Sequence, residues 1–596
     1  MNIADALTAA LAAHRANNLA DARAGYDAVL AAMPDNPDAL YLRGMIHLVE
    51  GELEQGEILT RRAIAAKPDF PEALGNLGRI AVARGKPELA VQIWQKSLRL
   101  KPDGSEIRLE LGRVLVAAKR YADAVANQLV GLLQTPDDPA MLLVLGNALQ
   151  GQGQTDAAIA TYRRGVALQP DNADHQHNLG VSLFEDREID AAIAQYRTAL
   201  ALRPTDPDIL NSLGVAQRAI GDLDAAVASY HAALAAAPAH AQALNNLGVA
   251  QTERRELDDA AASYRAAIVA DANAADPHYN LALTLLLGGH YREGWTEMEW
   301  RWKTAAFQKQ AQHFAVPAWT GDDAEGGMVL LHDEQGLGDT IQFSRFVARA
   351  ARRARVVLQV QRPLLRLLAD LPGPAMVIAR GDKLPAITRH LPLMSLPHIL
   401  GSEIPAAARY LHAPADRIGH WQKKLADLPG QRVGLVWAGN PRLGGTSYDR
   451  ADLRRSVALE QFRPLVTPGI SLVSLQKGAA ARQVAGFPIV DWSHELGDMA
   501  ETAALVSALD LVISVDTAVA HLAGALGRPV WLLNRFDCDW RWLAVGDNSV
   551  WYDSLRQFRQ PTAGDWTTPI ARMAMALHTT EFRHKTSPNC QTIGKH

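Results

Sequence analysis

A buried strand that leads directly into a helix carries the clearest chemical signal in the sequence. The apolar run at residues 511–515 is followed by Asp516 and Thr517, residue types that favour a helix N-cap. Backbone N–H groups at a helix start, together with the helix dipole, attract anions such as phosphate. His521 lies one turn further on, within reach of the same anion. The alternative is an ordinary capped helix with His521 at its edge.

A glycine-rich turn provides the second candidate site. The apolar run at residues 328–332 leads into Gln335-Gly336-Leu337-Gly338-Asp339. Glycines in such a turn let the backbone approach a ligand closely. A carboxylate at Asp339 can accept the proton of an attacking hydroxyl as a general base. The alternative is that Asp339 only caps the following helix. Gln335 is a candidate contact for either the donor or the acceptor of such a reaction.

Several further residues lie at predicted strand ends. Trp437, Gly439 and Asn440 end one strand, and Gln476 and Lys477 end the next. An arginine near them suits phosphate, because its planar fork binds two oxygens at once. Arg455 is the candidate for this role. For each of these residues the alternative is an ordinary loop position. The remaining candidates either shape a pocket or brace the last helix, and they are Asp537, Asp539, Trp540 and Arg541.

Apolar runs in the C-terminal half alternate with helical segments. Continuous apolar strands separated by helices predict parallel sheets that are covered on both faces. Two blocks of this kind, divided near residues 415–430, predict two Rossmann-like lobes with a cleft between them. The predicted strands are residues 328–332, 356–361, 376–379, 432–438, 471–476, 511–515 and 529–533. Helices are expected between them, including one at residues 339–352.

The N-terminal half repeats at a strict interval of 34 residues. A period of this length, with two amphipathic helices per unit, resembles the tetratricopeptide repeat and predicts an all-α superhelix. Eight units and a degenerate ninth are expected within residues 1–304. The markers are prolines at 34, 68, 102, 136, 170, 204 and 238, glycines at 44, 78, 112, 146, 180, 214 and 248, and an aromatic residue four positions after a small one in the second helix.

A broken series of asparagines shares one phase of these repeats. Asn76, Asn178, Asn246 and Asn280 each lie two residues before the glycine position or its equivalent. An asparagine offers both a donor and an acceptor, which suits an extended peptide backbone. The series resembles the asparagine ladder of the eukaryotic O-GlcNAc transferase, and this resemblance implies acceptor binding. The alternative is a solvated helix face.

Ordered motifs in the C-terminal half resemble a known enzyme family. VDTAVAHLAGALG followed by PVWLL resembles the donor-binding signature of heptosyltransferase-like glycosyltransferases, which have the GT-B fold. EQGLGDTIQF, RSVALEQFRPL, SLQKG and DWRW resemble the variant found in bacterial proteins with tandem tetratricopeptide repeats. The resemblance covers roughly residues 295–560. The order of repeats first and GT-B lobes second is similar to O-GlcNAc transferase.

The resemblance assigns roles to individual residues. Asp339 corresponds to the family's proposed catalytic base. The donor-binding set is Asp516, Thr517, His521, Lys477, Gln476, Arg455, Asn440, Trp437 and Gln335. No cofactor is implied, because the nucleotide-sugar donor is a substrate. The sequence shows no His/Cys cluster with metal-ligand spacing, so metal-independent transfer is expected.

The resulting expectation is a protein O-glycosyltransferase whose repeats select the acceptor. Flagellin, modified with a nonulosonic acid such as pseudaminic acid, is the specific hypothesis. The alternatives are transfer to a small-molecule or lipid saccharide and a non-catalytic repeat scaffold. The expected segments are a solenoid at 1–304, a linker at 305–327, a short N-terminal lobe at 328–415, a donor-binding lobe at 430–580 and a disordered tail at 581–596.

Bulk properties narrow the choice of partner. The net formal charge is −4 and charged residues make up 21%, so no strong attraction to nucleic acid is expected. The first residues are typical of a repeat helix and not of a signal peptide, and no long apolar run predicts a membrane span. Two cysteines, Cys538 and Cys590, do not form a disulfide framework. Cytoplasmic localisation is therefore expected.

Overall fold

The computed structural model describes residues 3–322, 324, 326–405, 408–439 and 454–578. The chain forms two compact units, Met1–Pro238 and Ala239–His596. The predicted segment boundaries at residues 304, 328, 415 and 430 stay predictions. The predicted tail at 581–596 lies outside the described residues.

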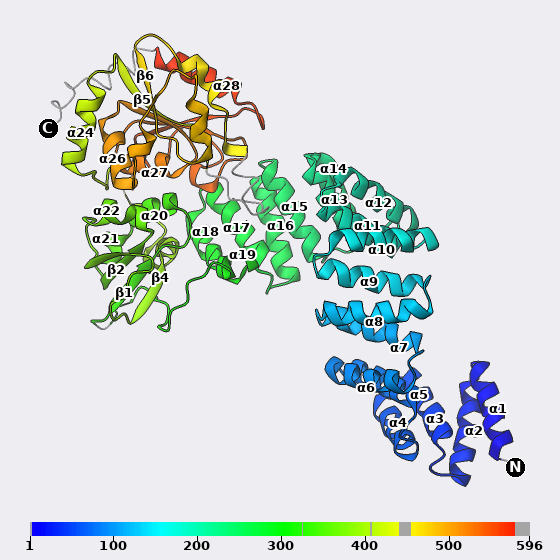
Figure 1. The fold of residues 1–596 in the computed structure, drawn as a ribbon. Helices are drawn as coiled ribbons and strands as arrows, with labels where there is room; N and C mark the ends of the chain where they lie inside the picture. Colours follow the sequence, from blue (N-terminus) through cyan, green and yellow to red (C-terminus); the bar gives the residue numbers. More distant parts are fainter. Residues whose placement is uncertain (1–2, 323, 325, 406–407, 440–453, 579–596) are drawn as a thin grey trace. The chain divides into compact units, whose positions relative to one another are not determined.

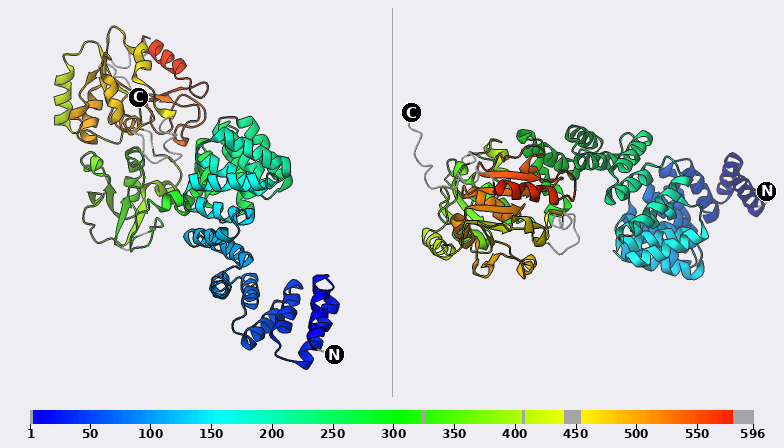
Figure 2. Two further views of the ribbon diagram at one scale, coloured as in Figure 1. Left: turned by 45° about the vertical axis from the view of Figure 1, so that its right-hand side comes forward. Right: turned by 90° about the horizontal axis from the view of Figure 1, so that it is seen from above.

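The first unit consists of paired helices, two for each 34-residue repeat (Figure 1). Consecutive helices lie alongside one another, and the views in Figure 2 show this stacking from two further sides. The helices are α1 (Ile3–Arg15), α2 (Leu19–Ala32), α3 (Pro37–Val49), α4 (Leu53–Ala66), α5 (Pro71–Ala83), α6 (Pro87–Leu100), α7 (Ser105–Ala117), α8 (Tyr121–Gln134), α9 (Pro139–Gly151), α10 (Thr155–Leu168), α11 (Ala173–Glu185), α12 (Ile189–Leu202), α13 (Pro207–Ala219) and α14 (Leu223–Ala236).

The repeat markers meet in space. A Cβ added at Gly214 in α13 would lie 2.6 Å from the ring of Tyr230 in α14. Tyr230 and Ala226 are both fully buried, because the small residue lets the helices approach and the ring fills the space beside the glycine. The same relation holds for Gly180 with Tyr196. These contacts explain why the sequence repeats its glycine and its aromatic residue in register.

The second unit begins with the last repeat helices and continues into the α/β region. The repeat helices are α15 (Ala241–Glu253), α16 (Leu257–Ala270), α17 (Ala275–Leu287) and α18 (Tyr291–Met298), followed by the 3₁₀ helix η1 (Glu299–Lys303) and by α19 (Ala305–Gln308). Trp295 of α18 is buried, with its ring centroid 5.7 Å from Phe343 and 5.3 Å from Trp540. The tryptophan-rich end of the repeats therefore docks onto the α/β region, as its composition predicts.

Arg301 in η1 secures this docking from within the core. Its side chain is fully buried and bonds both oxygens of Glu334, at 3.0 and 3.3 Å. It also donates to Ser395 Oγ at 2.8 Å and to Glu299 at 2.8 Å. Because Glu334 directly precedes Gln335, the network fixes the base of the glycine-rich loop.

The first sheet is parallel, with strand order β3-β2-β1-β4. It confirms the predicted strands at 328–332, 356–361 and 376–379 to within one residue, and adds a strand that sequence reasoning left in a loop. The predicted helix at 339–352 is two short helices. The elements are β1 (Met328–His332), α20 (Leu337–Ser344), α21 (Val347–Ala350), β2 (Arg355–Val360), α22 (Leu365–Leu368), β3 (Met376–Ala379), β4 (Arg389–Pro392) and α23 (Leu396–Leu400).

The second sheet is also parallel, with strand order β10-β9-β8-β5-β6-β7. Every residue of β8 and β9 is buried, which is the reason for their mostly apolar sequences. The elements are α24 (Ala415–Leu425), β5 (Gln431–Val436), η4 (Leu459–Leu465), β6 (Ile470–Ser474), β7 (Val490–Asp491), α26 (Met499–Ala508), β8 (Leu511–Val515), α27 (Ala518–Ala525), β9 (Val530–Asn534), β10 (Leu555–Arg559) and α28 (Thr567–Leu577). The predicted fold class, all-α repeats followed by an α/β region, is confirmed.

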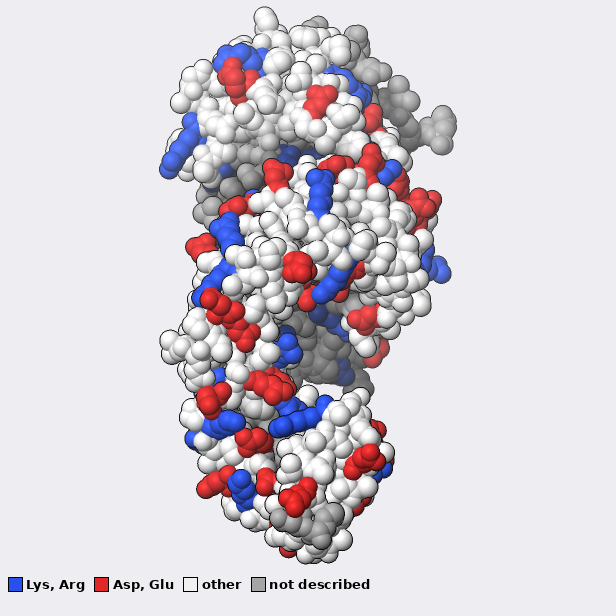
Figure 3. Space-filling view, turned by 90° about the vertical axis from the view of Figure 1, so that its right-hand side faces the viewer, with Lys and Arg blue, Asp and Glu red and all other residues white. Residues whose placement is uncertain are grey.

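Among the described residues, no helix combines the length and apolar character that crossing a membrane requires. On the face drawn in Figure 3, Lys and Arg side chains are interspersed with Asp and Glu over the repeats. This face shows no large patch of a single sign.

Candidate active site

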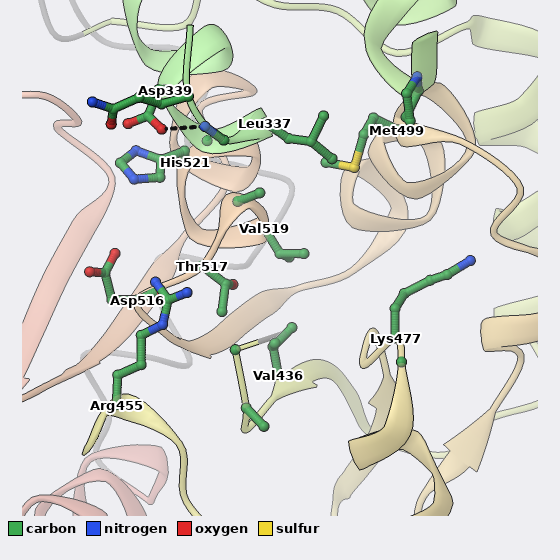
Figure 4. Close-up of a pocket in the computed structure, with 18 of the residues that line it drawn as sticks. Leu337, Asp339, Val436, Arg455, Lys477, Met499, Asp516, Thr517, Val519 and His521 are labelled. Atoms are coloured by element: carbon green, nitrogen blue, oxygen red, sulfur yellow. Dashed lines mark hydrogen bonds between the residues drawn. The ribbon is translucent and has the colours of Figure 1, made fainter. Parts of the chain in front are cut away.

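A cavity of about 670 Å³ opens within the second unit, at the ends of strands from both sheets. The first sheet contributes the Gln335–Asp339 loop that follows β1. The second sheet contributes the residues that follow β5, β6, β8 and β9. Ligands of open parallel sheets bind at this edge of the strands, and the volume lies within the range of ligand pockets. The two predicted sites, which are far apart in sequence, therefore form one cavity (Figure 4).

The start of α27 faces this cavity without a side-chain cap. Thr517 is the N-cap residue and has an extended backbone, with φ −142° and ψ 169°. Its hydroxyl lies 3.0 Å from Ser514 Oγ and makes no capping bond to the helix. The first N–H groups of α27 are thus left for a ligand, and a helix start of this kind attracts phosphate.

Arg455 places a cation beside this helix start. Its guanidinium donates to the backbone oxygen of Asp516 at 2.8 Å, and both residues line the cavity. Burial, followed by repulsion from Asp539, raises the pKa of Asp516, while Arg455 and Arg541 oppose the shift.

Asp339 both caps its helix and lines the cavity. One carboxylate oxygen accepts from Gly336 N–H at 2.8 Å, and the other forms an ion pair with Arg541. The two alternatives raised by the sequence, helix cap and cavity carboxylate, therefore coexist. Figure 4 places this carboxylate beside the ring of His521. The base role itself stays a prediction.

Arg541 joins carboxylates from both lobes. Besides Asp339, it donates to Gln342 Oε1 at 2.8 Å and to Asp539 Oδ1 at 2.8 Å. Burial alone would raise the pKa of Asp539, but the charge and hydrogen bonds of Arg541 lower it overall. The sequence left two alternatives for residues 537–541, namely shaping a pocket or bracing the last helix. Asp539 and Arg541 line the cavity. Trp540 packs against Trp295 instead.

His521 is buried in the cavity wall. Its Nδ1 lies 2.9 Å from the hydroxyl of Tyr552, and its ring stacks on Trp542 with the centroids 5.1 Å apart. Burial, and then the charge of Arg541, lower the pKa of His521 to about 3. The side chain is therefore neutral near pH 7 and can contact an anion only as a hydrogen-bond donor.

Gln476 and Lys477 lie at the end of β6. Among the described residues, the amide of Gln476 bonds only to backbone groups. It accepts from Trp437 N at 3.1 Å and from Ala438 N at 2.9 Å, and it donates to Ala438 O at 3.0 Å. It therefore braces the ends of β5 and β6. Lys477 donates to the carbonyls of Ser493 and Leu496, and in Figure 4 its side chain points away from Asp516.

One described member of the predicted donor set is not brought to the cavity. The side chain of Trp437 is fully buried in the core of the second sheet and is not part of the cavity wall. Asn440 lies outside the described residues. Gln335 does line the cavity.

Other cavity residues were missed by sequence reasoning. Arg535 directly follows β9, so the rule that ligands bind at the carboxyl ends of parallel strands could have identified it. Met499 at the start of α26 and Phe307 in α19 carry no comparable signal. Phe307 reaches the cavity only because the repeats dock onto the first sheet.

The predicted asparagine series is not uniform. Asn76 is buried in α5, so the structure does not present its side chain to a partner. Asn178 donates to Asn147 at 3.0 Å, and Asn280 donates to Asn245 at 3.0 Å. These bonds link neighbouring repeats, and an acceptor role for Asn178, Asn246 and Asn280 stays a prediction.

One group of possible metal ligands occurs among the described residues, namely His47, Glu50 and Glu52. His47 Nδ1 contacts Glu52 at 2.5 Å, and Arg43 contacts the other ring nitrogen at 2.7 Å. Arg23 pairs with Glu50. The group lies in the early repeats and does not line the cavity.

Comparisons with known proteins agree with this division of the chain. A tetratricopeptide repeat model matches residues 7–71, 75–139, 143–207 and 211–277. The N-terminal half is a tetratricopeptide-repeat region. The model of glycosyltransferase family 9 (heptosyltransferase) matches residues 496–535. That segment contains β8, α27 and β9, with Asp516, Thr517 and His521 at the cavity.

Individual relatives cover part of the chain. This chain is 29% identical to Protein FlbA of Caulobacter vibrioides over 336 aligned residues. The aligned region covers 50% of this chain and 54% of that protein. The chain thus spans about half the length of this curated relative. Similar solved structures include MamA 41-end from Desulfovibrio magneticus RS-1 (21% identity, 28% of this chain and 96% of that chain, TM-score 0.28). The Cut9–Hcn1 hetero-tetramer is another (17% identity, 48% of this chain and 57% of that chain, TM-score 0.35).

Proposed function

We propose that this protein is a glycosyltransferase that binds a nucleotide-sugar donor in the cavity at the start of α27. One observation carries the proposal. In the segment that matches the family 9 model, the N-cap residue Thr517 leaves the helix start uncapped and facing a cavity. An uncapped helix start beside the guanidinium of Arg455 supplies the N–H groups and the positive charge that a diphosphate requires.

The same cavity offers a carboxylate for the other half of the reaction. The acceptor hydroxyl attacks the anomeric carbon, a new C–O bond forms, and the bond to the donor phosphate breaks with its electrons passing to that phosphate. The hydroxyl proton passes to the carboxylate of Asp339. Arg541 pairs with Asp339 at the cavity wall. A bound phosphate competes for Arg541 and thereby frees the Asp339 carboxylate to accept the proton.

The proposed acceptor is a serine or threonine of a protein that the repeats bind. Repeat solenoids present extended surfaces to partners, which supports a protein acceptor over a small saccharide. Flagellin with a nonulosonic acid is the finer hypothesis, and it rests on the resemblance of the motifs and of the domain order. Metal-independent transfer and a cytoplasmic site of action are part of the same proposal.

Donor binding is the first test. The full chain is titrated by calorimetry with UDP, GDP, ADP and CMP, with and without EDTA. We expect one nucleotide to bind, and Arg455→Gln to weaken its binding by about tenfold, the usual value of one charge-assisted bond. Failure of all four nucleotides to bind would refute the proposal and favour a non-catalytic scaffold.

Acceptor modification is the second test. Purified flagellin is incubated with the protein and with candidate sugars on the nucleotide that binds, and its intact mass is measured. A mass increase of one sugar residue supports protein glycosylation. The paired variant Asn246→Ala/Asn280→Ala is expected to reduce the modified fraction while nucleotide binding stays unchanged. Sugar transfer only to saccharides or lipid fractions would overturn the protein-acceptor hypothesis.

A further inference from the structure

The ring of His521 is held from the side that faces away from the cavity. Its Nδ1 lies 2.9 Å from the Tyr552 hydroxyl, whereas none of the described residues hydrogen-bonds its Nε2. Tyr552 in turn packs against Gly524, where an added Cβ would lie 2.4 Å from the tyrosine ring. Tyr552 therefore packs against α27 at Gly524 and contacts His521 of the same helix. This places the Tyr552 hydroxyl where it bears on the position of the histidine proton.

Tyr552 keeps its proton. The side chain is fully buried, and burial raises its pKa well above the ordinary value. The Arg345 guanidinium carbon lies 4.9 Å from the centre of the Tyr552 ring and 4.6 Å from that of Tyr410. A cation over a phenol ring withdraws electron density, so the hydroxyl becomes a stronger donor and a weaker acceptor.

Tyr410, the neighbouring tyrosine, already has an acceptor for its own hydroxyl proton. Tyr410 donates its hydroxyl proton to the backbone oxygen of Ile341 at 2.8 Å. Arg345 carries donors only and cannot accept a proton. Nδ1 of His521, at 2.9 Å, is an acceptor within reach of the Tyr552 hydroxyl.

Charged groups of both signs act on His521. Asp339 and Asp539 act on His521 as negative charges, and Arg541 and Arg345 act as positive ones. Arg541 is itself paired with both carboxylates.

We propose that Tyr552 and Arg345 are positioning residues that hold His521 as the Nε2–H tautomer. His521 then binds a phosphate oxygen of the donor as a neutral hydrogen-bond donor and not as a cation or a proton carrier. This inference rests on the proposed function only for the identity of the ligand. The tautomer itself is a property of the free protein.

The tautomer can be measured without any ligand. The full chain, deuterated and labelled with ¹⁵N-histidine, is studied by NMR between pH 6 and pH 8, and His521→Asn identifies the signals. We expect Nε2 to be protonated and Nδ1 to have the shift of an acceptor. Tyr552→Phe and Arg345→Met are expected to increase the Nδ1–H population. A protonated Nδ1 in the unsubstituted protein would overturn the proposal.

A pair of substitutions tests the role of the N–H. The amide nitrogen of glutamine occupies the place of Nε2, and that of asparagine the place of Nδ1. With whichever of UDP, GDP, ADP and CMP binds, we expect His521→Gln to stay within about threefold of the wild-type affinity. His521→Asn and Tyr552→Phe should each lose about tenfold, which is the value of one hydrogen bond to a charged group.

Combining the variants separates positioning from a purely structural effect. Because glutamine has no tautomer to fix, Tyr552→Phe/His521→Gln should bind as His521→Gln does. Additive losses in the double variant, or equal affinities of the glutamine and asparagine variants, would overturn the proposal. If no nucleotide binds the wild-type protein, the proposed function fails, and the NMR measurement still decides the tautomer.

Discussion

Arg541 forms an ion pair with Asp339 across the cavity, although the two residues are 202 positions apart in the sequence. One belongs to the second sheet's loops and the other to α20 beside the first sheet. The pair balances the charge of the candidate base. It also ties the two lobes together at the place where the reaction is proposed to occur.

Asp339→Asn tests the base assignment. The amide cannot accept the hydroxyl proton, so we expect the transfer rate to fall by about 10²- to 10⁴-fold with nucleotide affinity little changed. Asp382→Asn is the matched control, because Asp382 also accepts a backbone N–H, from Ala379 at 3.0 Å, and pairs with an arginine, Arg362, outside the cavity. Equal rates for the two variants would exclude Asp339 as the base.

Arg541→Gln tests the link between the lobes. Removing one partner of a largely buried ion pair leaves uncompensated charge, so we expect the free energy of unfolding to fall by about 3 kcal/mol in urea titrations. The double variant with Asp339→Asn should be more stable than the sum of the single losses predicts, by about 1–3 kcal/mol. Arg353→Gln, at an exposed arginine, is the control and should change little. Strict additivity would contradict the coupling.

The lowered pKa of His521 predicts acid sensitivity. Burial, and then the charge of Arg541, lower this pKa from 6.5 to about 3. Between these values the unfolded chain binds a proton that the folded chain does not, so stability falls as the pH drops from 6.5 to 3. The slope for one such group is about 1.4 kcal/mol per pH unit.

His521→Gln removes this contribution and should make the loss of stability between pH 6.5 and pH 4 shallower. Burial also lowers the pKa of His332 to about 3, so part of the slope should remain. The control is His494→Gln, because the side chain of His494 is 74% exposed. Unfolding in urea at several pH values measures the difference, and identical slopes for the two variants would contradict the assignment.

Glu334→Gln tests the anchor of the glycine-rich loop. The side chain of Arg301 is fully buried, so loss of its charge partner should lower the free energy of unfolding by about 3–5 kcal/mol. Glu403→Gln is the control, since this exposed partner of Arg349 should change stability by at most about 0.5 kcal/mol. Chemical denaturation measures both, and similar losses in the two variants would show that the buried network does not hold the loop.

Local patterns predicted much of the fold because their causes are local. The glycine at 214 and the tyrosine at 230 recur in register because helix pairs of one kind must stack, so the repeats can be recognised in the sequence alone. The strands β1, β3 and β8 were found at their observed bounds because buried parallel strands are mostly apolar runs. β4 was missed because its sequence, RHLP, has no such run.

The candidate site was predicted in part for the same reason. A strand that ends at a helix cap indicates an anion site in the sequence itself. Asp516 and Thr517 line the cavity, and their role in binding an anion stays a prediction. By contrast, a strand-end position alone did not show that the side chain of Trp437 turns into the core. The direction of a side chain after a strand depends on the packing of both faces.

The sequence by itself determined the repeat architecture, the parallel strands and the helix start that attracts an anion, because each follows from residues close together in the chain. Only the tertiary structure decided that Arg541 reaches Asp339 and that Tyr552 holds His521. The first contact joins the segment after β9 to α20, and the second joins α27 to the segment before β10. Such long-range pairing depends on how the sheets and their covering helices pack.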